Sequence, residues 1–159
     1  MKLMTIGIII GVVAGLLLGW LITFLAMPKL MFKESESHLG FEATVTRAQE
    51  QIDAKGWKTP VVHDLQATML KFDHEVRSVK VMEICHPDHS YKILKESKER
   101  IVSSMMPCRI SVYEKEDGSV WISRMNSGVV AKPMSRIIRE TMTAAADDVE
   151  LIIAEVLRE

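Results

Sequence analysis

The sequence predicts an α+β fold, in which a single N-terminal transmembrane helix precedes a compact domain with a mainly antiparallel sheet covered by helices. Three observations support this class. Residues 3–28 contain no charged side chain, short stretches between residues 61 and 124 have the character of strands, and a long apolar seam follows Pro133. The predicted boundaries are 3–27 for the helix, 28–43 for a polar connector and 44–159 for the domain.

The first segment is long enough to span a membrane. Residues 3–27 form a helix of roughly 37 Å, which exceeds the ~30 Å hydrocarbon layer. A cleaved signal peptide has a shorter apolar region, followed by a cleavage site with small residues. The sequence around Phe24–Lys29 lacks such a site. The positive-inside rule is nearly tied, because Lys2 precedes the segment while Lys29 and Lys33 follow it. Only two residues precede the apolar segment, which is typical of a signal-anchor. This predicts that the domain is exported to the periplasmic or extracytoplasmic side.

Glycines recur at every fourth position of this segment. Four residues turn a helix by ~400°, so they form one slowly drifting stripe that lets another helix approach closely. We therefore expect this glycine zipper to contact a second copy of the chain or another membrane protein. The predicted helix-contact residues are Gly7, Gly11, Gly15 and Gly19.

The elements of the domain follow from local signals. Thr46 and Gln49 match a capping box, which predicts a helix over 45–55. Pro60 opens a predicted strand over 61–68, and the apolar stretch 79–85 predicts a central strand.

The second half of the domain contains a helix, a hairpin and a final helix. Asp88 can cap a helix that includes Tyr91 and Leu94. Asp117-Gly118 predicts a turn between strands 109–114 and 119–124. Pro133 suits the first position of the last helix.

Composition excludes some functions. The net charge of −1 disfavours nucleic-acid binding, which needs a strongly basic face. The sequence has no glycine-rich phosphate loop and no nucleophile elbow. These observations favour a protein that is not an enzyme.

Two cysteines lie at the ends of predicted strands, and several interpretations of them stay open. Cys85 and Cys108 are candidates for a disulfide if the domain is exported. They are also candidates for inert buried thiols. A further interpretation is that one of them is a catalytic thiol beside a histidine. A strand–helix–strand crossover would separate them, so the sulfurs meet only if residues 99–107 fold back along the sheet.

A metal or haem site is a further interpretation. Thiolate, imidazole and thioether groups suit copper, zinc or haem iron. Met105 and Met106 could join the same cluster under that fold-back. The predicted metal ligands are Cys85, His86, His89 and Cys108.

Several of these motifs together resemble a known family. The residues in question are Gly56-Trp57, Val61, Val62, Asp64, Thr68, Cys85-His86-Pro87, Tyr91, Leu94, Pro107 to Glu114 and Asp117-Gly118. Over about residues 44–157 the chain is similar to domain of unknown function family 302. The resemblance implies a compact, TATA-binding-protein-like α+β domain and homodimers, and it brings no settled activity. The chain departs from the family at His86, where members often have Asn, and in its membrane anchor.

The leading hypothesis is therefore a non-enzymatic binding or assembly module, tethered in the cell envelope by one helix. The alternative is a metal- or haem-binding, redox-linked protein that uses the cluster around Cys85 and Cys108.

Overall fold

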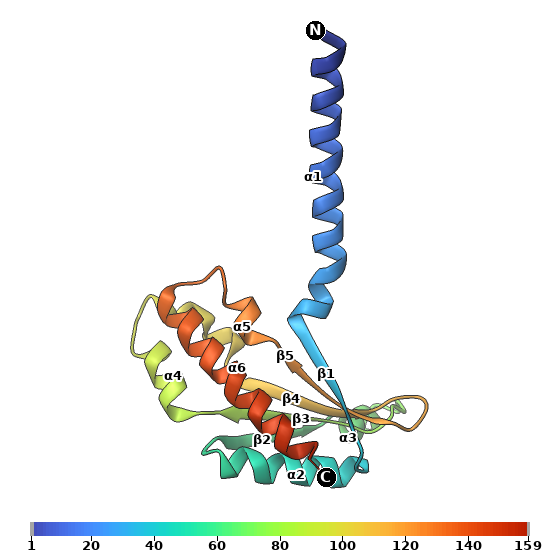
Figure 1. Ribbon diagram of the computed structural model, residues 1–159. Helices are drawn as coiled ribbons and strands as arrows, with labels where there is room; N and C mark the ends of the chain where they lie inside the picture. The colour runs from blue at the N-terminus through green and yellow to red at the C-terminus, as the bar shows by residue number, and fades with distance from the viewer. Residues whose placement is uncertain (1, 159) are drawn as a thin grey trace.

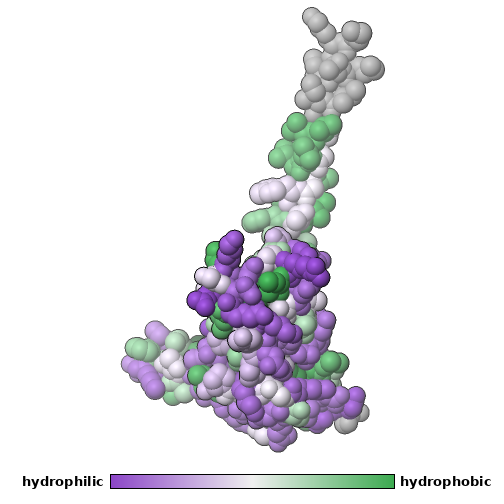
Figure 2. All heavy atoms as spheres, turned by 90° about the vertical axis from the view of Figure 1, so that its left-hand side faces the viewer, coloured by the Kyte–Doolittle hydropathy of each residue, from purple (hydrophilic) through white to green (hydrophobic). Residues whose placement is uncertain are grey.

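A long helix projects from a folded domain in the computed structural model, which describes residues 2–158. This helix, α1 (Lys2–Met31), is longer than the predicted 3–27, because Pro28 lies inside it and the helix continues to Met31. Within the described residues, one helix is long and apolar enough to cross a membrane by length and composition, and none of its span Ile10–Met31 is buried. Figure 2 shows hydrophobic residues along α1, above a domain whose visible face is mostly hydrophilic.

The domain is built on one five-stranded antiparallel sheet, which confirms the predicted α+β class. The strand order is β1-β5-β4-β3-β2, and every neighbouring pair is antiparallel. The hairpin predicted around Asp117-Gly118 is present, and Gly118 has the positive φ of +82° that its turn needs. The strands are β1 (Phe32–Ser37), β2 (Lys58–Asp64), β3 (Val79–Cys85), β4 (Cys108–Glu114) and β5 (Val120–Met125).

The segment predicted as a connector, 28–43, contains an edge strand. Its residues Phe32–Ser37 pair with β5 over their whole length. No apolar alternation marks this strand, because its inward positions include the small polar residues Ser35 and Ser37. Ser37 is buried and its Oγ lies 2.8 Å from the Thr44 Oγ1, so local polar contacts replace hydrophobic packing. The domain therefore begins at β1 rather than at residue 44.

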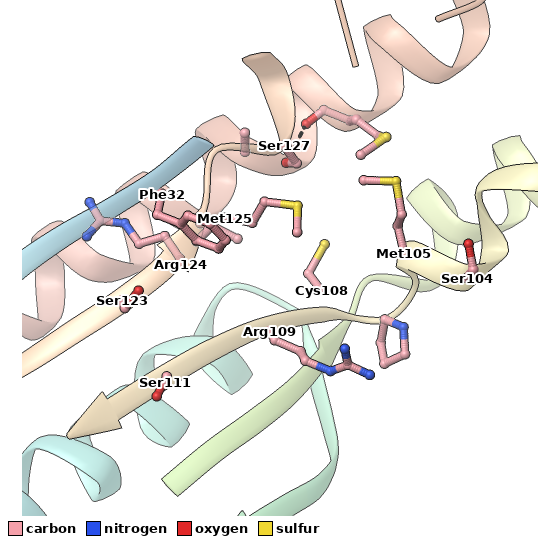
Figure 3. A pocket seen from close by; sticks show the side chains of 14 residues that line it. Phe32, Ser104, Met105, Cys108, Arg109, Ser111, Ser123, Arg124, Met125 and Ser127 are labelled. Atoms are coloured by element: carbon pink, nitrogen blue, oxygen red, sulfur yellow. Dashed lines mark hydrogen bonds between the residues drawn. The ribbon is translucent and has the colours of Figure 1, made fainter. Parts of the chain in front are cut away.

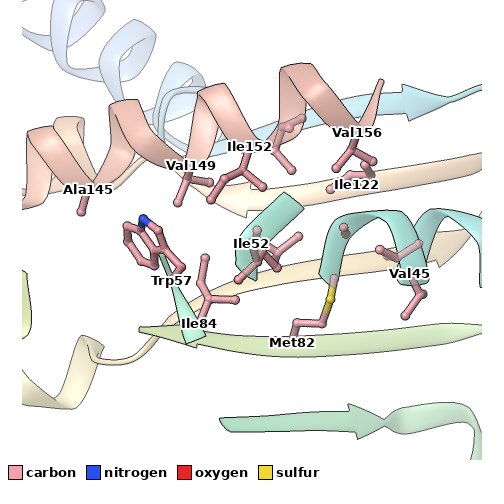
Figure 4. Close-up of a cluster of buried hydrophobic side chains, with 14 of the residues drawn as sticks. Val45, Ile52, Trp57, Met82, Ile84, Ile122, Ala145, Val149, Ile152 and Val156 are labelled. Carbon is pink, nitrogen blue, oxygen red and sulfur yellow. The ribbon is translucent and has the colours of Figure 1, made fainter. Parts of the chain in front are cut away.

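Two helices cover one face of the sheet, α2 (Phe41–Ala54) and α6 (Arg136–Val156) (Figure 1). The core lies between them and the inward side chains of β3, β4 and β5 (Figure 4). The long seam on α6 supplies a large share of this core, as its periodicity predicts. The fully buried side chains of the core include Ile52, Trp57, Met82, Ile84, Ile110, Val112, Ile122, Ile152, Ile153 and Val156.

Three predicted boundaries are wrong for local reasons. The capping box at Thr46 is not used, because α2 already begins at Phe41 with Gly40 as its N-cap. The strand predicted to reach residue 68 ends at Asp64. The Asp64 Oδ1 accepts a hydrogen bond from the Ala67 amide at 2.8 Å and so starts helix α3 (Leu65–Leu70). Helix α6 begins at Arg136 with Ser135 as its cap, and not at Pro133.

Three short helices gather at the end of the sheet where α1 meets β1 (Figure 1). They are α4 (Pro87–Leu94), the 3₁₀ helix η1 (Glu99–Met105) and α5 (Ser127–Val130). The helix predicted after Cys85 is present, but it begins earlier than predicted, with His86 as its N-cap, so Asp88 lies in its first turn and does not cap it. This end of the sheet contains the candidate site.

Candidate functional site

The two cysteines come to the same edge of the sheet. Strands β3 and β4 are antiparallel, and Ile84 pairs with Cys108. The end of β3 therefore adjoins the start of β4. The segment that folds back is η1, which follows α4 and returns the chain to this edge. Cys85 and Cys108 are both free thiols in the structure. A disulfide between them stays a prediction that thiol titration of the purified chain decides.

The cluster predicted from the sequence surrounds a small space, which we call the inner cavity. Its volume is about 40 Å³. The His86 and His89 rings lie beside each other, with centroids 4.8 Å apart, and both contact the buried Trp57 ring. The inner cavity is lined by Trp57, Ile84, Cys85, His86, His89, Ser90, Ile93, Val102, Met105, Met106, Pro107, Cys108, Thr141, Met142 and Ala145.

Several polar atoms near the inner cavity lack partners. Within the described chain, Trp57 Nε1, His86 Nδ1 and His89 Nδ1 are buried without a hydrogen bond. The opposite nitrogen of His89, Nε2, lies 2.9 Å from Asp148 Oδ2. A cavity of about 40 Å³ has room for a few water molecules.

The inner cavity does not present a preformed site for a hard or borderline metal. Among residues 2–158, no group of three or more His, Cys, Asp or Glu side chains is placed to hold a metal ion. Cys85 Sγ lies 3.1 Å from Ser90 Oγ and is occupied by that contact. Burial raises the pKa of the Cys108 thiol, and the neighbouring Cys85 raises it further. Cys108 is therefore a protonated thiol at neutral pH.

A second and larger space, which we call the end cavity, opens where two strands separate. The register of β4 and β5 ends at the pair Ile110 and Arg124. Beyond this pair the strands diverge, and α6 closes the space behind them. The volume of the end cavity is about 360 Å³. It is lined by Phe32, Ser104, Met105, Pro107, Cys108, Arg109, Ser111, Ser123, Arg124, Met125, Ser127, Met142, Ala146 and Val149.

Sulfur atoms dominate the middle of the end cavity. Figure 3 shows the side chains of Met105, Cys108 and Met125 directing their sulfur atoms into the same space, each from a different element. Met142 of α6 is also part of the lining, and its carbonyl accepts a hydrogen bond of 3.2 Å from Ser127 Oγ. The two cavities share Met105, Pro107, Cys108 and Met142, so Cys108 lies between them.

An ion pair with a buried arginine fixes one wall of the end cavity. The side chain of Arg124 is only 6% exposed, and it donates to Glu150 on α6 at 2.6 and 3.1 Å and to Ser35 on β1 at 2.8 Å. Burial by itself would raise the pKa of Glu150. The hydrogen bonds and charges of Arg124 and Lys33 outweigh burial, so the pKa of Glu150 lies below its usual value. The pair connects the sheet to the helix that closes the cavity.

The end cavity adjoins the base of α1. Phe32, which follows the last residue of α1, is part of the lining. The Asn126 amide donates to the Met31 carbonyl at 2.7 Å, and its side chain donates to the Leu30 carbonyl at 3.1 Å. If α1 spans a membrane, the end cavity therefore lies at the membrane-facing end of the domain.

The glycines of α1 lie apart from both cavities. A Cβ atom built at Gly7, Gly11, Gly15 or Gly19 would meet nothing within 4 Å in the described part of the chain. The stripe therefore offers open space for a partner helix, and its predicted contact role stays a prediction.

Sequence reasoning found part of this site and missed part. It singled out Cys108, together with Met105 and Met106, because all three lie in the short segment before a predicted strand and carry soft sulfur ligands. It missed Met125, Met142 and Arg124, which come to the end cavity only through the sheet register and the packing of α6. Residues on β5 alternate between inward and outward positions, and Arg124 falls at an inward position. A charged residue at an inward position was the one signal in the sequence that could have indicated a polar wall here.

Comparisons with known proteins give a family and a fold. The model of the family described as "Domain of unknown function DUF302" matches residues 33–159. An "Uncharacterized protein" of Aquifex aeolicus (strain VF5) is 27% identical over 136 residues, which cover 83% of this chain and 88% of the relative. A crystal structure of an "uncharacterized conserved protein DUF302" from Bacillus stearothermophilus has a TM-score of 0.72 at 15% identity, and the match covers 80% of this chain and 98% of that one. At this low identity the structure shows a shared fold and no shared activity. Because the family model covers well over half of its length, the chain belongs to the DUF302 family.

Proposed function

We propose that this chain is a single-pass membrane protein whose DUF302 domain is a non-enzymatic binding module. The observation that supports this function is the end cavity. Its volume of about 360 Å³ falls within the range of roughly 300–1,000 Å³ that is usual for small-ligand pockets. Its lining is mainly apolar, with a few serine and arginine side chains, which is the usual composition of such pockets.

The groups around the end cavity favour binding over chemistry. Its titratable side chains are Arg109, Arg124 and Cys108. Arginine has no acceptor and keeps its proton in proteins, so it does not act as a general base. Burial raises the pKa of Cys108, so the reactive thiolate is scarce at neutral pH. Catalysis at this site would need a nucleophile or base that the lining does not provide.

In this proposal, the membrane anchor determines where the end cavity lies relative to the membrane. In the proposal, α1 stays embedded and holds the end cavity next to the lipid headgroups, with the domain on the extracytoplasmic side. The helix resists extraction with alkaline carbonate if it is embedded. Protease added to intact cells or spheroplasts removes the domain if it is exported, whereas a protected domain contradicts the exported orientation.

Native mass spectrometry of the full chain in lipid nanodiscs tests ligand binding. Ala146 lines the end cavity on α6, so Ala146→Phe fills it, whereas Ala144→Phe places the same ring on the exposed side of the same helix. We expect the wild-type chain and A144F to retain a non-lipid adduct, a small molecule or an ion, that A146F lacks. Bare chains in all three samples, or an adduct that A146F retains, would contradict the proposal. Melting curves of the variants verify that they fold.

The second candidate function is the redox-linked metal or haem protein, and the geometry supports it less well. The predicted ligands Cys85, His86, His89 and Cys108 do line one cavity. However, about 40 Å³ is far too small for a haem, and the end cavity has no histidine in its lining. An absorption spectrum of the purified chain with a haem Soret band would favour this candidate over the binding module.

A further inference from the structure

We propose that the end cavity is a Cu(I) site whose ligands are one thiolate and three thioethers, those of Cys108, Met105, Met125 and Met142. This inference rests on the proposed function and names the class of ligand, a soft monovalent metal ion.

The first support is convergence. Met105 ends η1, Cys108 begins β4 and Met125 ends β5, so the ligands come from separate elements that only the fold brings together. Their sulfur atoms point into one space in Figure 3. Met142 joins the lining from α6. Four sulfur-containing side chains thus surround a cavity, whereas methionines that merely fill a core leave no open space between them.

The second support is the chemistry of the donor set. Thiolate and thioether sulfur are soft ligands, and soft ligands select Cu(I) over harder ions. Zinc and the divalent transition metals prefer sites with several imidazole, thiolate or carboxylate ligands. The described residues contain no group of three or more such side chains placed for a metal. The sulfur set therefore discriminates against the commoner metals.

The third support is charge balance. Arg124 is already neutralised by Glu150, and Arg109 by its ion pair with Glu83. Cys108 is thus the one group of the lining that can supply a negative charge to an ion. When Cu⁺ binds, the Cys108 S–H bond breaks, a Cu–S bond forms and the proton leaves to solvent, while copper keeps its oxidation state. One positive ion and one thiolate leave the site neutral, whereas a divalent ion would leave an uncompensated charge.

The cavity also provides a route for the ion. Ser111 and Ser123 are paired on the face of the sheet that α2 and α6 do not cover, and both line the end cavity. Met125, which follows the same alternation on β5 as Ser123 and also lines the cavity, is 41% exposed, so this side of the cavity opens towards solvent. An ion delivered from solution can therefore reach the sulfur atoms without unfolding of the core.

The test measures Cu(I) binding by the full chain in lipid nanodiscs. Protein stripped with a chelator is titrated with ascorbate-reduced Cu(I) against bicinchoninate as competitor. We expect one Cu(I) per chain and, in X-ray absorption spectra, sulfur neighbours alone. The variant Met105→Leu/Met142→Leu keeps the side-chain volume and removes two thioethers, so we expect affinity to fall at least about tenfold. The matched control Met69→Leu, on α3, changes a methionine outside both cavities and should not alter affinity.

Three outcomes would overturn the copper site. They are a wild-type chain that does not compete for Cu(I), a leucine double variant that binds as tightly as wild type, and absorption spectra with imidazole neighbours, which would point to His86 and His89 instead. Cys108→Ser, which keeps the cavity open, gives an independent check and should abolish stoichiometric binding. A chain that takes no copper but retains the adduct excluded by A146F would refute this inference and leave the proposed function standing. Loss of both would refute both.

Discussion

The Arg124–Glu150 pair should respond unequally to the removal of its two members. Arg124 is 6% exposed, and the side chain of Glu150 is 34% exposed. In Glu150→Ala the guanidinium stays buried with Ser35 as its remaining side-chain partner. An uncompensated buried charge costs about 3–5 kcal/mol. In Arg124→Met the carboxylate keeps Lys33, 3.3 Å away, and contact with water, so we expect a loss of about 1–2 kcal/mol.

Urea unfolding of the full chain in nanodiscs measures both losses. The fluorescence of Trp57, which is 2% exposed in the core, reports on the domain, while Trp20 lies in α1. With a slope of about 2 kcal/mol/M, E150A should lower the midpoint by roughly 2 M. The matched control is Glu140→Ala, which breaks the exposed pair with Arg136 and should change stability by under about 1 kcal/mol. If R124M costs as much as E150A, the argument from unequal burial is refuted.

Three further predictions concern the core, the pH dependence and the anchor. Ile152 is fully buried, so Ile152→Ala should cost about 2–5 kcal/mol in urea unfolding, whereas Leu151→Ala on the exposed side should stay within about 0.5 kcal/mol. Because the pKa of Glu150 is lowered in the folded state, its contribution to the free energy of unfolding is fully present above about pH 4.5 and is lost as the pH falls through the folded pKa. Unfolding free energies measured over a pH series check this. The prediction fails if the free energy of E150A falls with decreasing pH as steeply as that of the wild type. Gly11→Leu/Gly15→Leu should weaken self-association of the chain in micelles, measured by sedimentation equilibrium, and an unchanged association constant would remove the glycine contact.

Most of the fold could be predicted because its signals are local and apolar. The strand over 79–85, the hairpin around Asp117-Gly118 and the seam of α6 all follow from periodicity and turn chemistry. The edge strand β1 could not be predicted in this way. Its sequence alternates charged and small polar residues. It becomes a strand because its backbone pairs with that of β5, which would otherwise be the edge of the sheet. The pairing partner lies almost 90 residues away in the chain, so no local pattern in the sequence indicates it.

The candidate site was predictable only in part for the same reason. Cys108 and Met105 were recognisable because both lie in the segment Met105-Met106-Pro107-Cys108, just before a predicted strand. The topology that joins Cys85 to Cys108 was expected only under a fold-back. The antiparallel pairing of β3 and β4 provides that geometry directly. Met125 and Met142 look like ordinary core residues in the sequence. Their role depends on where β4 and β5 diverge and on which face of α6 closes the gap, and no local pattern encodes either.

The most direct test of the central claim is a crystal or cryo-electron-microscopy structure of the full chain, purified from its own membranes without a chelator. The account predicts ordered density inside the end cavity, in contact with Met105, Cys108 and Met125. A cavity that contains only ordered water, or one that has collapsed so that these side chains touch, would contradict the claim that this domain is a binding module.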